Sequence, residues 1–283
     1  MYSKQELATT TTTSLPAEVS EVVKAAAIEQ IKWVAKLRDM GWVDGSLSEG
    51  DRVYIFNKLD QLNAAEVVAE AAEPNYDEAG ATKGTADVLK LMKAFKISWE
   101  ADNLKQINVR AGQARQATTE VFDLEDNKIA IALISGSGNT NASPSDWSSN
   151  TADPVADIRN AKRLIRDDGF TADVMILNPT NNEELDSVIA SNTWYSVTEQ
   201  TVKTGEPFPF MGLKRVECRY QTLGTATIMK SGMAGAFHLA EAKPLTVHMF
   251  DDNDAQVTKV QVYERVAPAA IVRPNCIATL VGI

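Results

Sequence analysis

The sequence has few of the residues on which catalysis, metal binding and covalent cross-linking depend. Its 283 residues include only two cysteines and two histidines: Cys218, Cys276, His238 and His248. Neither cysteine belongs to a CxxC motif or a Cys/His metal-binding spacing, and two such thiols are typical of a reducing cytoplasm. The histidines fall on separate predicted strands, where we interpret both as structural residues. A Cys218–His238 pair is the alternative, although no neighbouring residue supports it.

Long apolar runs and clusters of basic residues are also missing. No apolar stretch reaches the roughly 18 residues that a membrane span needs, and the N-terminal residues contain no apolar signal core. The chain has 28 Lys and Arg against 38 Asp and Glu, which gives a net charge of −10. An acidic chain repels phosphate, and this disfavours tight binding of nucleic acid. We therefore expect a protein that is made in the cytoplasm and contacts no membrane.

Motifs for phosphate binding and nucleophilic catalysis are missing or out of context. The sequence contains neither G-x-x-x-x-G-K nor G-x-S-x-G. Ser135–Thr140 (SGSGNT) is similar to the phosphate loop of flavodoxins, but it follows a helical pattern, so we interpret it as part of a polar linker over 135–152. Asp251–Asp254 lacks the ligand spacing of an EF-hand loop and is typical of a hairpin turn. The sequence predicts no catalytic residue, cofactor or metal site.

The N-terminal part of the chain predicts an arm followed by a helix and a strand. The threonine run Thr9–Thr13 and Pro16 predict an extended arm. Apolar residues at helical spacing predict a helix that ends near Gly41. The segment RVYIFN (52–57) then predicts a short strand.

Residues 58–98 contain two strand-like runs around a polar stretch, AAEPNYDEAGATKGT (71–85). The second run, DVLKLMKAFKIS, alternates apolar and polar residues, as a strand does. The segment predicts a long β-hairpin with a tip of about 15 residues, which is uncommon inside a compact domain. Because so polar a tip cannot form a core, we expect it to contact a neighbouring subunit. The contact candidates are Glu73, Pro74, Tyr76 and Lys83.

The rest of the chain predicts one very long helix, then an α/β segment, then many strands. Apolar residues over 99–134 step by threes and fours, which predicts a spine-like helix with a break near 123–127 as an alternative. Asp153 and Pro154 predict the start of the next helix, and Thr180 with Glu183 predicts a capping box for another. Residues 207–283 form a series of strand-like runs.

Three phrases of this sequence resemble the major capsid proteins of tailed bacteriophages and archaeal tailed viruses, which share the Hong-Kong-phage-type capsid fold. VLKLMKAFKISWEADNL is similar to the family's strand that returns from the extended loop into the spine helix. ADPVADIRNAKRLIRDDGFTADVMILNPTNNEEL is similar to its axial domain, and VYERVAPAAIVRPNCIATLVGI to its final strands. The order of the elements matches over nearly the whole chain.

The resemblance implies an α+β fold with an N-terminal arm, an extended β-hairpin loop, a long spine helix, a peripheral β-sheet domain and an axial α/β domain. The implied parts are 1–40 for the arm and helix, 52–98 for the extended loop, 99–145 with 246–283 for the peripheral domain, and 146–245 for the axial domain. In some relatives a loop lysine forms an isopeptide bond with an asparagine. Lys83 and Asn275 lie in the corresponding regions, but the surrounding motif does not match, so this chemistry is not transferred.

The function implied is mechanical. Many copies would assemble as hexamers and pentamers of an icosahedral shell around double-stranded DNA, in a virion built in the host cytoplasm. The DNA would be held without sequence-specific contact, and the short arm implies a separate scaffold protein or none. Portal and decoration proteins are further expected partners. An encapsulin-like compartment that encloses an enzyme remains an alternative, as does a soluble α/β enzyme that uses the Ser135–Thr140 loop.

Overall fold

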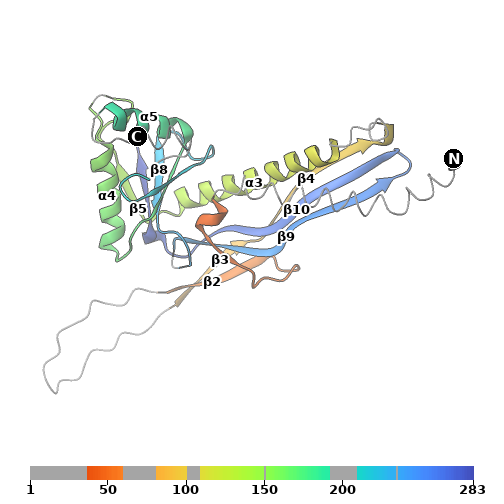
Figure 1. The fold of residues 1–283 in the computed structure, drawn as a ribbon. Coiled ribbons are helices and arrows are strands. Elements are labelled where there is room, and N and C mark those ends of the chain that lie inside the picture. Colours follow the sequence, from red (N-terminus) through yellow and green to blue (C-terminus); the bar gives the residue numbers. More distant parts are fainter. Residues whose placement is uncertain (1–36, 60–80, 101–108, 150, 192–208, 234) are drawn as a thin grey trace, which may run out of the picture.

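The structure, a computed structural model, describes residues 37–59, 81–100, 109–149, 151–191, 209–233 and 235–283. It has the expected mixed α+β architecture, in which a long sheet with one long helix joins a second sheet flanked by shorter helices (Figure 1). The predicted arm, most of the predicted first helix, and the contact candidates Glu73, Pro74 and Tyr76 lie outside the described residues.

The larger body is a four-stranded sheet with one long helix along a single face (Figure 1). Its strands, in spatial order, are β1 (Trp42–Asp44), β9 (Phe237–Asp252), β10 (Val257–Ile271) and β4 (Leu89–Ser98). The helix is α3 (Val109–Ser135), which continues through 123–127 without a break. Alternate residues of β4, including Leu91 and Ile97, are buried beneath it. The helix and sheet therefore share one apolar core, to which α3 contributes Val121, Ile129 and Leu133.

A two-stranded hairpin leaves this sheet on the side away from α3 (Figure 1). It consists of β2 (Val53–Leu59) and β3 (Ala81–Asp87), which pair antiparallel. The hairpin was expected, but its return strand is β3, and the run 89–98 pairs instead with β10. Tyr54 and Phe56 fasten the base of the hairpin, since both are buried against Ala240 and Ala267.

The second body is a five-stranded sheet, ordered β5 (Asn139–Ala142), β11 (Ile277–Val281), β8 (Thr225–Met229), β6 (Val174–Leu177) and β7 (Lys214–Glu217). It is flanked by α4 (Pro154–Asp167) and α5 (Pro179–Ser191). Two short 3-10 helices, η1 (Arg38–Met40) and η2 (Pro274–Cys276), complete the described elements. The strands β5 and β11 come from ranges that the sequence analysis assigned to the peripheral domain. They pair in parallel within this second sheet, with Asn139 opposite Ala278. None of the described helices is long and apolar enough to span a membrane.

The interpretation of 135–152 as a linker is wrong. Residues 139–142 form β5, and Trp147 is fully buried with its indole N–H donating to Asp157 at 3.0 Å. The serines and asparagines that suggested a loop are satisfied locally; the Ser143 hydroxyl, for example, donates to the same carboxylate at 2.7 Å. The segment is thus polar in composition but ordered by one buried aspartate.

Two smaller expectations also need correction. Asp153 caps α4 as predicted, accepting from the Ala156 N–H at 3.0 Å. The cap of α5, however, is Asn178, whose side chain accepts from the Thr180 N–H at 3.1 Å. Asn178 precedes Pro179, which starts the helix one residue before the predicted capping box. His238 and His248 lie on one long strand, β9, rather than on separate strands.

Candidate assembly surfaces

The projecting hairpin presents an outward face that nothing among the described residues covers. Burial alternates along β2: Tyr54 and Phe56 point to the sheet, whereas Ile55 is 63% exposed and Val53 is 42% exposed. Lys83, the one contact candidate that the structure describes, is exposed on β3 opposite Asn57. Exposed isoleucine and valine side chains on a two-stranded hairpin are typical of a surface that packs against another chain.

The N-terminal side of this hairpin is tied to the core by a buried cluster of charges around Arg38. Its Nη1 donates to Glu125 on α3 at 3.1 Å and to Glu264 on β10 at 3.1 Å. Its Nη2 pairs with Glu241 on β9. The neighbouring Leu37 N–H donates to Asp126 at 3.2 Å. One guanidinium therefore joins η1, the long helix and two strands of the sheet.

Among the described residues, three glutamates of this cluster, Glu125, Glu241 and Glu264, pair with one cation, Arg38. Glu125 and Glu264 have side chains that are 0% and 1% exposed. One oxygen of Glu264, Oε1, has no hydrogen-bond partner among the described residues. Burial raises the pKa of Glu125, and the nearby Glu264 raises it further. Burial, with a contribution from nearby Glu241, likewise raises the pKa of Glu264, although Arg38 acts to lower it. The arrangement favours a proton on this pair.

Sequence reasoning missed this cluster, although a signal for it was present. Glu125 lies four residues after Val121 and four before Ile129, on the buried stripe of α3. Glu264 likewise lies between Val262 and Val266 on the buried side of β10. A charged residue on an apolar stripe is rarely buried without a partner. The partner, Arg38, could not be identified from spacing alone.

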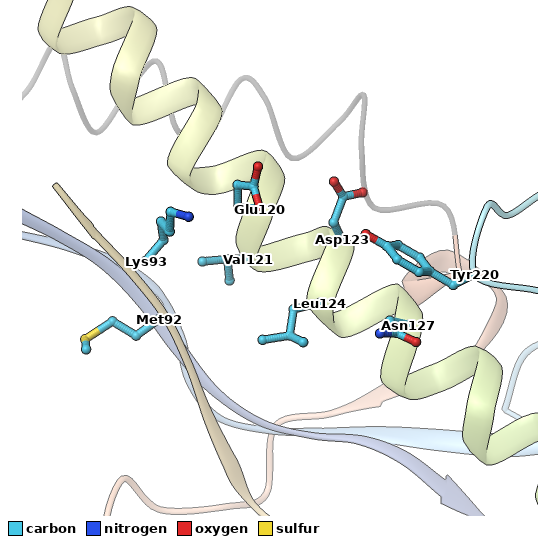
Figure 2. A pocket seen from close by; sticks show the side chains of 8 residues that line it. All are labelled: Met92, Lys93, Glu120, Val121, Asp123, Leu124, Asn127 and Tyr220. Atoms are coloured by element: carbon cyan, nitrogen blue, oxygen red, sulfur yellow. The ribbon is translucent and has the colours of Figure 1, made fainter.

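A groove of about 310 Å³ lies between β4 and α3. Met92, Val121 and Leu124 supply its apolar lining, and Lys93, Glu120, Asp123, Asn127 and Tyr220 its polar lining. Figure 2 shows Lys93 directed from β4 towards the helix and Met92 directed to the other side of the strand. At its rim, Arg219 pairs with Asp123 and lies over the ring of Tyr220, 4.8 Å from the centroid. No group in the groove has the geometry of a nucleophile with its base.

The remaining candidates occupy structural positions. Cys218 and Cys276 are both buried, and neither forms a disulfide. His238 lies edge-on to Trp42 with ring centroids 4.6 Å apart. Asp251 and Asp252 are the last residues of β9, and the turn of the predicted hairpin follows at 253–256. Asp251 accepts from the Thr258 hydroxyl and Asp252 from Lys259. Asn275 is exposed in η2, and its carbonyl accepts from Asn139 at 3.2 Å.

Comparison with known proteins finds similarity to proteins of viral capsids and a virus-like particle. A family model described as phage capsid protein matches residues 82–280. Among solved structures, a virus-like particle from Pyrococcus furiosus is similar at 14% identity, with 92% of this chain and 98% of that chain covered and a TM-score of 0.67. The capsid of the cyanophage P-SCSP1u is similar at 14% identity, with 87% of both chains covered and a TM-score of 0.65. The mature capsid of bacteriophage PhiM1 is similar at 12% identity, with 86% of both chains covered and a TM-score of 0.62. No curated protein matches the sequence.

Proposed function

The chain belongs to the phage capsid protein family and is a structural, shell-forming protein; on that premise we propose that its copies form an icosahedral capsid around double-stranded DNA. The shell would be built from hexamers and pentamers in the host cytoplasm, and it would form the wall of the virion. The net charge of −10 supports a wall past which packaged DNA can move without adhering. The proposed role needs no cofactor and no catalytic residue.

The observation that carries this proposal is the exposed β2–β3 hairpin. A two-stranded ribbon is at best marginally stable by itself in water. Its base is fastened by Tyr54 and Phe56, while Ile55 and Val53 point outwards. A neighbouring subunit that covers this outer face would stabilise the ribbon and would at the same time link one copy to the next. Glu73, Pro74, Tyr76 and Lys83 remain the proposed contact residues of the loop.

The division into peripheral and axial domains also remains a proposal. The four-stranded sheet with α3 would form the peripheral domain, and the five-stranded sheet with α4 and α5 the axial domain. The apolar cluster around Trp147, Ile158 and Leu177 supports a separate axial part. The cluster beneath α3 also takes in Val174 and Ile176 of the five-stranded sheet, so the two parts share one packed boundary.

Microscopy of the purified protein tests the proposal. We expect negative-stain images of the expressed chain to show closed shells of uniform size. Nuclease-protected DNA in particles isolated from infected cells is the expected content. An enzyme co-enclosed in place of DNA, identified by mass spectrometry, would instead support the compartment alternative. A protein that stays monomeric under all assembly conditions would contradict the proposal.

A further inference from the structure

The five-stranded sheet has one helix beside each of its two edges. Its strand order places β5 at one edge and β7 at the other. Helix α4 lies beside β5 (Figure 1), since the Asn141 side-chain amide donates to the Asp157 carbonyl at 3.4 Å. Helix α5 is tied to β7, since the Asn182 side-chain amide donates to the Glu217 carboxylate at 2.7 Å. The two edges of the sheet therefore present different helices to the outside.

Helix α4 carries a stripe of positive charge. Arg159, Arg163 and Arg166 follow one another at spacings of four and three residues, so they share one face of the helix, and all three are exposed. Arg163 pairs with Asp167 at 3.6 Å. Arg159 and Arg166 form no ion pair with any residue that the structure describes. We call the three residues the arginine face.

The opposite edge carries negative charge. Helix α5 contains acidic residues but neither lysine nor arginine. Within the described ranges, no cation pairs with Glu183, Glu184 or Glu217, and Glu183 is exposed. We call these three residues the acidic edge. The dipole of α5 favours glutamates in its first turns, but the arginine face begins in the middle of α4, where a helix dipole gives no such preference.

The direction of the strands allows one edge to meet the other in a second copy. Strand β5 is parallel to β11, which is antiparallel to β8. Strand β6 is also antiparallel to β8 and is parallel to β7. The edge strands β5 and β7 therefore run in the same direction. A rotation about an axis along the strands keeps that direction, so it can bring the β5 edge of one copy beside the β7 edge of the next.

We propose that the arginine face of one copy binds the acidic edge of a second copy. Each copy then offers one surface of each kind, which is a heterologous contact that repeats around a closed ring. Opposite charge fixes which edges meet, because contact between two arginine faces or two acidic edges would place like charges together. The inference rests on the proposed function, since it requires copies of the chain to assemble, and it identifies charged surfaces that would join them.

Charge reversal separates this contact from the folding of the protomer. Arg159→Glu/Arg166→Glu changes two exposed residues without an ion-pair partner among the described residues, so we expect a nearly unchanged melting temperature. We expect the concentration needed for shell formation to rise at least tenfold. Glu183→Lys/Glu184→Lys changes the opposite surface and should cause a similar rise, which provides a second test if either chain folds poorly.

A matched control shows whether net charge alone is responsible. Lys96→Glu/Lys128→Glu makes the same change in charge as Arg159→Glu/Arg166→Glu, but on exposed residues of β4 and α3, outside the second sheet. We expect this chain to assemble at a concentration close to that of the unmodified protein. Equal impairment of the control would assign the effect to net charge and would overturn the inference.

Combining the two reversals in one chain is the decisive step. A chain with Arg159→Glu, Arg166→Glu, Glu183→Lys and Glu184→Lys again has opposite charges on its two edges, and we expect it to form shells. Folded protomers of this chain that remain unassembled would overturn the inference. So would normal shells from Arg159→Glu/Arg166→Glu, including shells that have only lost their DNA, which would assign the arginine face to nucleic acid. If the unmodified chain forms no shells, the proposed function itself fails.

Discussion

Arg38 Nη1 lies 3.1 Å from Glu125 Oε1, although 87 residues separate the two in the sequence. The contact joins η1 to the middle of α3, and the same nitrogen reaches Glu264 on β10. Arg38 thus connects the segment that leads into the projecting hairpin to the rigid part of the larger body. Several properties of the protein should depend on this one side chain.

Replacing Arg38 with methionine should destabilise the protomer by about 3–5 kcal/mol. Removing one partner of a buried ion pair leaves the remaining charges uncompensated, and this costs more than the pair contributes. Here Glu125 and Glu264 would both remain buried without their cation. Urea unfolding of the assembly-incompetent protomer measures the loss. Arg163→Met, on an exposed pair with Asp167, is the matched control and should cost no more than about 1 kcal/mol.

The stability of the protomer should fall as the pH is raised from about 4.3, the ordinary value for glutamate, towards and beyond neutrality. Burial raises the pKa of Glu125 and Glu264 in the folded protein, so the folded state holds more protons than the unfolded state across this range. Under these conditions the free energy of unfolding decreases with pH. Thermal melts at a series of pH values measure the slope. The account is wrong if stability rises steadily over the same interval.

A neutral isostere at one of these glutamates should remove much of that pH dependence. Glu264→Gln eliminates one buried titrating group and keeps the shape of the side chain, whose Oε1 has no hydrogen-bond partner among the described residues. We expect the variant to be at least as stable as the unmodified protein at pH 8. We also expect its melting temperature to change less with pH. Glu120→Gln, on the exposed side of α3, is the control and should leave the slope unchanged.

The helix α3 should be sensitive to truncation on one face only. Val121 is 1% exposed and packs in the core shared with the sheet. Val121→Ala removes buried methyl groups and leaves a cavity, so we expect a loss of about 2–3 kcal/mol. Gln116 is exposed, and Gln116→Ala should change stability by less than about 0.5 kcal/mol. Equal losses at the two positions would contradict the packing described here.

Local patterns in the sequence predicted most elements of the fold. Alternating runs marked the strands that became β2, β4 and β10, and helical spacing marked α3. The return strand of the hairpin was misplaced because Val88 separates two strands without a glycine or proline to mark the change of partner. The sequence ATKGTAD of β3 is small and polar, and only its pairing with β2 makes it a strand.

The candidate surfaces were less predictable because they depend on contacts between distant residues. Asn182 and Glu217 are far apart in sequence, and only their hydrogen bond shows that α5 lies beside the edge strand β7. The Arg38 cluster similarly joins four elements. The composition of the hairpin tip did indicate a candidate surface, because a long polar segment between two strands cannot form a core by itself.

The central claim is that the hairpin links subunits, and deletion of its tip tests it most directly. Residues 61–79 would be replaced by a short Gly-Ser turn, which keeps β2, β3 and their pairing. Sedimentation and negative-stain microscopy would then be compared with the thermal melt of the protomer. The account predicts a folded protomer with a nearly unchanged melting temperature and no closed shells. Closed shells of normal size from the shortened chain would contradict it.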